Sequence, residues 1–175
     1  MTKIAIIQRP PVLLDRSATI ARAVQSVAEA AAAGASLIVL PESFIPGYPS
    51  WIWRLAPGRD GALLSQLHGR LLANAVDLAS ADLDPLYQAA REHGVTLVCG
   101  LNECERRQGG GTLYNSVVVI GTDGALLALM GHDPVDLDTL AQRSGRTPSE
   151  LSAVLLELEL AGRLERHAGA RVSLA

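Results

Sequence analysis

The sequence is poor in aromatic residues, which make up 3% of its 175 residues, and it has only two cysteines. Two cysteines do not make a disulfide-built domain, and no further ligand pair follows them at the spacing of a zinc site. The glycine run at 109–111 does not open a helix, so it is not a phosphate-binding loop. We therefore expect no metal and no cofactor.

No apolar run approaches the length that crosses a membrane, and the opening apolar stretch is too short for a secretion signal. These absences predict a cytoplasmic protein that does not contact a membrane. The net charge of −3 argues against a strongly basic nucleic-acid binder. Hydrophobic residues make up 49% of the chain, which is enough to bury a core of Ala, Val, Leu and Ile.

Short apolar runs alternate with helical periodicity in the first part of the chain. Buried strands are predicted at 3–8, 36–40, 95–101 and 113–120, with a fifth that begins near residue 125. Helices are predicted at 16–34, 61–79 and 83–93, and an irregular loop at 44–60. Strands that alternate with long helices indicate an α/β domain over residues 1–128, with its first two strands parallel.

The remaining residues, 129–175, have a different sequence pattern, which predicts a second, smaller domain. A short helix at 137–144 is followed by a strong helix start at 147–150, which has a capping residue and a proline at the first helical position. Two short strands at 163–166 and 171–174 then form a hairpin. Helix, turn, longer helix and hairpin in this order predict a winged helix-turn-helix.

The most informative stretch is LPESFIPGYPSWIW, residues 40–53, which holds four of the six aromatic residues. Glu42 lies just past a predicted buried strand, where a side chain faces the cleft at the end of a sheet. A carboxylate beside aromatic rings is partly desolvated, which suits a general base. The alternative is an ordinary loop carboxylate next to a surface aromatic cluster.

This stretch resembles the catalytic-glutamate motif of the nitrilase, or carbon–nitrogen hydrolase, superfamily. The continuation PGYPxWIW resembles the nitrile-hydrolysing branch in particular. The resemblance also covers the opening strand at 3–8 and the segments 98–103 and 112–116, and it extends over residues 3–128. It implies a truncated nitrilase-like layer, which is about half of the α-β-β-α sandwich of that family.

The resemblance also implies a chemistry, the hydrolysis of nitriles or amides to a carboxylate and ammonia. In that family a cysteine thiolate attacks the substrate carbon, a glutamate acts as general base, and a lysine stabilises negative charge. By resemblance Glu42 is the general base, and Tyr48, Trp53 and Asn115 lie at the substrate pocket. Asn115 fits equally well as a residue that holds a turn.

The lysine and cysteine of that site have no counterpart here. Lys3 is the only lysine, and residues 129–133, where the family lysine is expected, read Leu-Met-Gly-His-Asp. Cys99 is expected to be a small buried residue inside a strand, and Cys104 to be exposed in a loop. The sequence therefore predicts a hydrolase of non-peptide C–N bonds that is catalytically impaired.

Residues 131–175 resemble the C-terminal winged-helix domain of the DNA-processing protein DprA family, on segments 136–141, 149–152 and 155–162. This tail has five arginines, no lysine and seven acidic residues, a net charge of −2. An acidic recognition helix repels phosphates, so a packing or protein-contact role is favoured over DNA binding. The alternative function is a non-catalytic interaction protein, or a weak DNA binder, that acts through the tail.

Half of a sandwich leaves one sheet face or edge uncovered, and uncovered apolar strands drive association. We therefore expect a homo-oligomer unless the tail covers that surface. The junction between the two resemblances lies at 124–131. It is compatible with a natural fusion, a frameshift remnant or an engineered chimera.

Overall fold

The computed structural model describes residues 2–104, 112–131, 135–137, 147, 149, 151–152, 155–156, 159, 164–167 and 171–174. The helices of the first 104 residues are α1 (Arg16–Ala32), the short 3-10 helix η1 (Ser50–Trp53), α2 (Pro57–Asn74) and α3 (Asp84–His93). The strands are β1 (Ile4–Ile6), β2 (Leu37–Ile45), β3 (Thr96–Glu103), β4 (Tyr114–Ile120), β5 (Leu126–Gly131), β6 (Val135–Asp136), β7 (Leu164–His167) and β8 (Arg171–Leu174).

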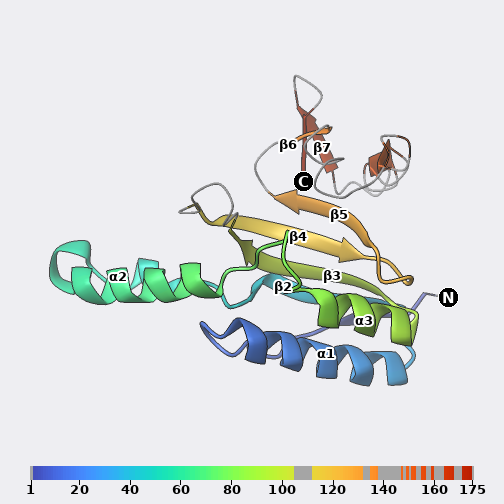
Figure 1. Cartoon of the computed structure of the whole chain (residues 1–175), viewed down its shortest axis with the longest axis horizontal. Helices are drawn as coiled ribbons and strands as arrows, with labels where there is room; N and C mark the ends of the chain where they lie inside the picture. The colour runs from blue at the N-terminus through green and yellow to red at the C-terminus, as the bar shows by residue number, and fades with distance from the viewer. Residues whose placement is uncertain are drawn as a thin grey trace.

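Five strands form one mixed sheet in the order β1-β2-β3-β4-β5 (Figure 1). The strands β1, β2 and β3 run parallel, whereas β4 and β5 each run antiparallel to the strand before them. Helices α1 and α3 pack side by side against this sheet. The structure thus confirms the predicted α/β architecture with a partial sheet and a parallel opening unit.

The position of helix α1 follows from its capping residues and from the helical spacing of its apolar residues. It follows Asp15, whose carboxylate accepts a hydrogen bond from the Ala18 amide at 2.9 Å and so satisfies one free backbone donor. Ala23 and Val27 are fully buried one turn apart and face the sheet. The chain leaves the helix through Gly34, whose φ of +87° favours glycine.

Helix α2 ends earlier than the sequence predicts. The expected helix spans 61–79, but α2 stops at Asn74 because the next residues pair with the end of β3. The Val76 amide donates to the Asn102 carbonyl at 2.8 Å, and the Cys104 amide donates to the Val76 carbonyl at 2.9 Å. Most of α2 extends away from the sheet (Figure 1), and among its residues only Leu71 is buried.

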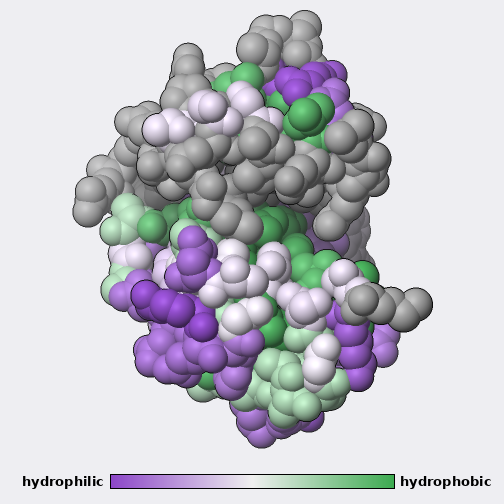
Figure 2. Space-filling view, turned by 90° about the vertical axis from the view of Figure 1, so that its right-hand side faces the viewer, coloured by the Kyte–Doolittle hydropathy of each residue, from purple (hydrophilic) through white to green (hydrophobic). Residues whose placement is uncertain are grey.

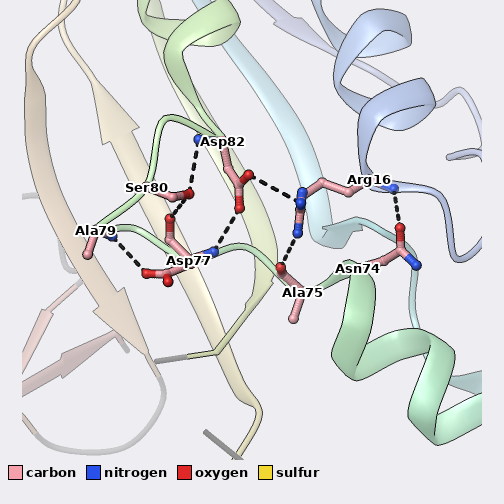
Figure 3. Close-up of polar contacts among 7 residues, drawn as sticks. All are labelled: Arg16, Asn74, Ala75, Asp77, Ala79, Ser80 and Asp82. Carbon is pink, nitrogen blue, oxygen red and sulfur yellow. Dashed lines mark hydrogen bonds and ion pairs between the residues drawn. The ribbon is translucent and has the colours of Figure 1, made fainter. Parts of the chain in front are cut away.

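Arg16, the first residue of α1, fastens the connection between α2 and α3 (Figure 3). Its guanidinium donates to the Ala75 carbonyl at 2.7 Å and pairs with the Asp82 carboxylate at 3.3 Å. Its backbone amide donates to the Asn74 side chain at 3.2 Å. Asp82 also accepts from the Asp77 amide at 3.1 Å, so the Arg16–Asp82 pair connects the start of α1 to the turn that contains Asp77.

Strand β1 is present, but the prediction that it is buried is wrong. Ile4 is 57% exposed and Ile6 is 70% exposed. β1 is the edge of the sheet, and these two side chains lie two residues apart on the same face.

Viewed from the side, apolar residues form a band across the middle of the molecule at the height of the sheet (Figure 2).

The C-terminal strands form a second, antiparallel sheet in the order β6-β8-β7. The hairpin β7–β8 lies where the sequence predicts it. The predicted helix at 137–144 falls almost entirely outside the described residues, so the winged helix-turn-helix and the division at residue 128 stay predictions. β5 itself continues in the first sheet to Gly131. Within the described part of the chain, no helix has the length and hydropathy needed to cross a membrane.

Candidate functional site

Glu42 lies on a bulge at the end of the parallel part of the sheet. β2 and β3 pair in register as far as Leu40 and Cys99, and the pairing resumes at Ile45 and Leu101. Four residues of β2, 41–44, therefore stand opposite the single residue between Cys99 and Leu101. A bulge of this kind re-aims the side chains it carries, and here it exposes Glu42.

Gly100 is the residue opposite that bulge, and no larger residue fits there. A Cβ at this position would lie 2.4 Å from the Pro41 carbonyl oxygen, 2.6 Å from the Glu42 Cα and 2.8 Å from the Ser43 nitrogen. All three are backbone atoms, which cannot rotate away. The close approach of β2 to β3 at Glu42 therefore depends on the missing side chain of Gly100.

The carboxylate of Glu42, on β2, is held by a residue of β4, which lies on the other side of β3 in the sheet. The Asn115 side-chain amide donates to Glu42 Oε1 at 2.6 Å. The hydroxyl of Ser43, which is buried, lies 3.2 Å from Asn115 Oδ1 and donates to it. Two of the residues predicted for the site, Glu42 and Asn115, are thus in direct contact.

The other two predicted site residues, Tyr48 and Trp53, lie beyond the bulge. Tyr48 is 43% exposed and Trp53 is 76% exposed. Phe44 is the buried aromatic residue of this stretch and packs in the core. The substrate-binding roles of Tyr48 and Trp53 therefore stay predictions.

Asn102 is a residue of this region that sequence reasoning did not single out. Its buried side-chain amide donates to the Gly47 carbonyl at 3.1 Å and to the Ile45 carbonyl at 3.4 Å. These bonds tie the chain after the bulge to β3. The only signal in the sequence is its position at the end of a strand, since a long-range contact of this kind has no local pattern.

Both cysteines are buried. Cys99 lies in β3 with its side chain in the core, as predicted, and desolvation raises the pKa of its thiol to about 12. The expectation that Cys104 is exposed is wrong, because it is only 2% exposed. Its backbone amide donates to the carbonyl of Val76, because residues 75–77, expected to be helical, instead lie beside the end of β3.

Burial of Cys99 predicts a loss of stability in alkaline solution. An unfolded thiol ionises near pH 9.0, whereas the folded one stays protonated up to about 12. The unfolded state therefore releases a proton that the folded state keeps, and the unfolding free energy falls by roughly 1.4 kcal/mol per pH unit within that window.

Urea titrations at several alkaline pH values would measure that slope. The Cys99→Ala variant is the control, because it removes this thiol and leaves every other ionisable group in place. We expect a shallower slope for Cys99→Ala than for the unaltered protein. Equal slopes would show that the Cys99 thiol does not become buried on folding.

Lys3 lies at the wrong end of the sheet to assist Glu42. It precedes β1, and its ammonium group donates to the Ala33 carbonyl at the C-terminal end of α1. Glu42 follows the carboxyl end of the regular part of β2, which runs parallel to β1. Among the described residues, no group of three or more His, Cys, Asp or Glu side chains is placed to hold a metal ion.

The family model for carbon–nitrogen hydrolases matches residues 3–147 of this chain. The match continues past residue 128, the boundary predicted from sequence texture. An aliphatic nitrilase of Rhodococcus rhodochrous is 37% identical over 126 residues, which cover 72% of this chain and 32% of that protein. An arylacetonitrilase of Aspergillus oryzae is 34% identical over 125 residues, which cover 71% and 34%.

Solved structures share the fold at lower identity. The NitFhit protein of C. elegans superposes with a TM-score of 0.53 at 16% identity, over 75% of this chain and 28% of that one. An amidase from Nesterenkonia sp. AN1, with acrylamide added at its active-site cysteine, gives 0.51 at 21% identity, over 85% and 50%. This chain spans about a third of the length of the curated relatives that it matches. It belongs to the carbon–nitrogen hydrolase family.

Proposed function

We propose that this chain is the glutamate-bearing part of a hydrolase of small nitriles or amides, and that it does not hydrolyse them by itself. The observation that carries the proposal is the bulge that exposes Glu42 and the amide of Asn115 that holds it. An exposed carboxylate with a fixed partner suits proton transfer to or from a bound molecule.

The proposed substrate class rests on the relatives that match this chain and on the aromatic residues that follow Glu42. The relatives that match this chain include nitrilases and arylacetonitrilases, and the family model for carbon–nitrogen hydrolases spans the stretch that holds Glu42 and its aromatic neighbours. Tyr48 and Trp53, both substantially exposed, follow Glu42 closely in the chain. Aromatic side chains beside a carboxylate favour a small substrate with an apolar body and one polar carbon–nitrogen group.

The proposed impairment rests on where the other reactive groups lie. Lys3 is the only lysine in the sequence, and it contacts the end of α1 rather than Glu42. Cys99 and Cys104, the only cysteines, are both buried. When residues act as a catalytic unit, removing one or two of them lowers the rate by several orders of magnitude.

Binding can be tested separately from hydrolysis. Titration of the ¹⁵N-labelled chain with phenylacetonitrile should shift backbone amide signals of residues 42–48, and Glu42→Gln should change those shifts. Glu92→Gln is the matched control, since Glu92 is an exposed glutamate on α3. Shifts confined to residues outside the bulge, or no saturable shifts at all, would contradict the proposed substrate class.

We also propose that the chain self-associates through β1. Ile4 and Ile6 expose aliphatic surface on an edge strand, and the adjacent residues of β2 in register with them are Leu37 and Val39. An open strand edge with apolar side chains pairs readily with a second copy. Light scattering at micromolar concentration should therefore give a mass above that of one chain.

The variant Ile6→Lys should shift that mass toward the monomer, because a charge at the edge opposes pairing. Ile52→Lys is the control, since Ile52 is similarly exposed but lies in η1. A monodisperse monomer of the unaltered chain would rule out this association.

The alternative role in DNA binding is disfavoured by the charges of the described tail residues. Arg166 of β7 donates to both carboxylate oxygens of Glu159, at 2.8–2.9 Å. This bond lowers the pKa of Glu159, so the pair stays ionised and internally neutral. An arginine that is already paired contributes less to the neutralisation of phosphates.

A further inference from the structure

Asn115 contacts the proposed general base directly. Its Nδ2 lies 2.6 Å from Glu42 Oε1, and its Oδ1 lies 3.2 Å from the hydroxyl of Ser43. We propose that Asn115 is a positioning residue, which Ser43 orients and which in turn fixes the Glu42 carboxylate, rather than a residue that contacts substrate. The proposal rests on the proposed function of Glu42.

The charge of Glu42 fixes the direction of both hydrogen bonds. An ionised carboxylate can only accept, so the NH₂ group of Asn115 must face Glu42. The amide oxygen of Asn115 then faces Ser43, and the Ser43 hydroxyl must be the donor. The Glu42 carboxylate therefore selects the orientation of the Asn115 amide, and the Ser43 hydroxyl, which can donate or accept, donates to the amide oxygen that faces it.

Strand pairing and close packing hold the backbone of Asn115 and Ser43 in place around Glu42. Asn115 lies in β4 and pairs in register with Asn102 of β3, so its backbone position is set by the sheet. Ser43 is only 2% exposed and has a φ of +49°, a conformation that L-residues rarely adopt. Gly100 leaves the space in which the Ser43 backbone lies. A side chain that its neighbours already hold in one position loses little conformational entropy when it takes part in a reaction.

Asn115 engages only one of the two carboxylate oxygens of Glu42. Oε1 accepts from Asn115, whereas Oε2 accepts no hydrogen bond from any described residue. Glu42 is exposed, so solvent or a bound molecule can reach its carboxylate. A charge-assisted bond on one oxygen thus holds the group and does not occupy the oxygen that takes the proton.

The side-chain amide signals of Asn115 test the proposal without any need for turnover. In the ¹⁵N-labelled chain, Glu42→Gln replaces the charged acceptor by a neutral one, so the Asn115 NH₂ protons should shift and exchange with water on the order of fivefold faster. Ser43→Ala should also speed exchange, because it removes the orienting donor. Glu92→Gln, the control, should leave these signals unchanged.

Phenylacetonitrile separates positioning from substrate contact. If Asn115 acts through Glu42, its amide signals respond to Glu42→Gln more strongly than to the nitrile. If these amide signals do not change in Glu42→Gln and shift only when the nitrile is added, Asn115 contacts substrate and the proposal is overturned. Failure of the nitrile to bind would contradict the proposed function alone, because the coupling between Asn115 and Glu42 is measured without it.

Discussion

Replacement of Gly100 by alanine is expected to lower the unfolding free energy by about 3 kcal/mol and to displace Glu42 from Asn115. The new Cβ would lie within 2.8 Å of three backbone atoms of Pro41, Glu42 and Ser43. Since none of these atoms can move without moving the strand, the bulge must open or the strands must part. Overpacking of a core by comparable amounts costs 1–3 kcal/mol or more.

Urea denaturation measures the stability loss, and the Asn115 amide signals report the displacement of Glu42. Gly69→Ala is the matched control, because Gly69 lies within α2 with open space around it. That change should stabilise the chain by roughly 0.5–1 kcal/mol, since alanine favours a helix more than glycine does. A Gly100→Ala variant as stable as the unaltered chain would show that β2 does not approach β3 as closely as described.

Replacement of Arg16 by methionine is expected to cost about 2 kcal/mol of unfolding free energy. Methionine keeps most of the aliphatic volume but removes the bonds to Ala75 and Asp82 (Figure 3). The side chains of Arg16 and Asp82 are only 23% and 18% exposed, so a lone Asp82 carboxylate would remain largely desolvated. An unpaired, partly buried charge is costly.

The same substitution at Arg9 is the control for this prediction. Arg9 also pairs with an acid, Glu29, but both side chains are about half exposed, at 49% and 47%. Water therefore replaces the lost partner, and Arg9→Met should change stability much less than Arg16→Met. Equal losses for the two variants would mean that the turn at 75–83 does not depend on Arg16.

Much of the fold could be predicted from local pattern. Helix α1, helix α3 and the central strands have a capping residue, a glycine stop or a dense apolar run that marks them. The exposure of Ile4 and Ile6 could not be predicted in the same way, because an apolar run reads alike in a central strand and at an edge. Which strand is the edge is decided by the order of strands, which is a long-range property.

The candidate site likewise combines features that local sequence predicts with features that depend on long-range pairing. Glu42 stands out because it follows a buried strand and is followed by aromatic residues. The contact with Asn115 depends on how β4 pairs with β3, and Cys104 is bonded through its backbone to the segment that follows α2. Neither contact joins residues nearby in sequence, so two roles stayed open for Asn115, a substrate-pocket residue by resemblance or a residue that holds a turn, and the expected exposure of Cys104 was wrong.

The release of ammonia from a panel of aliphatic and aromatic nitriles and amides shows whether this chain hydrolyses carbon–nitrogen bonds by itself. The chain would be compared with its Glu42→Gln and Cys104→Ser variants under the same conditions. We expect no release above the blank for any of the three, because Lys3 contacts the end of α1 and both cysteines are buried. Turnover that Glu42→Gln abolishes would contradict this expectation and would show that other groups complete the site.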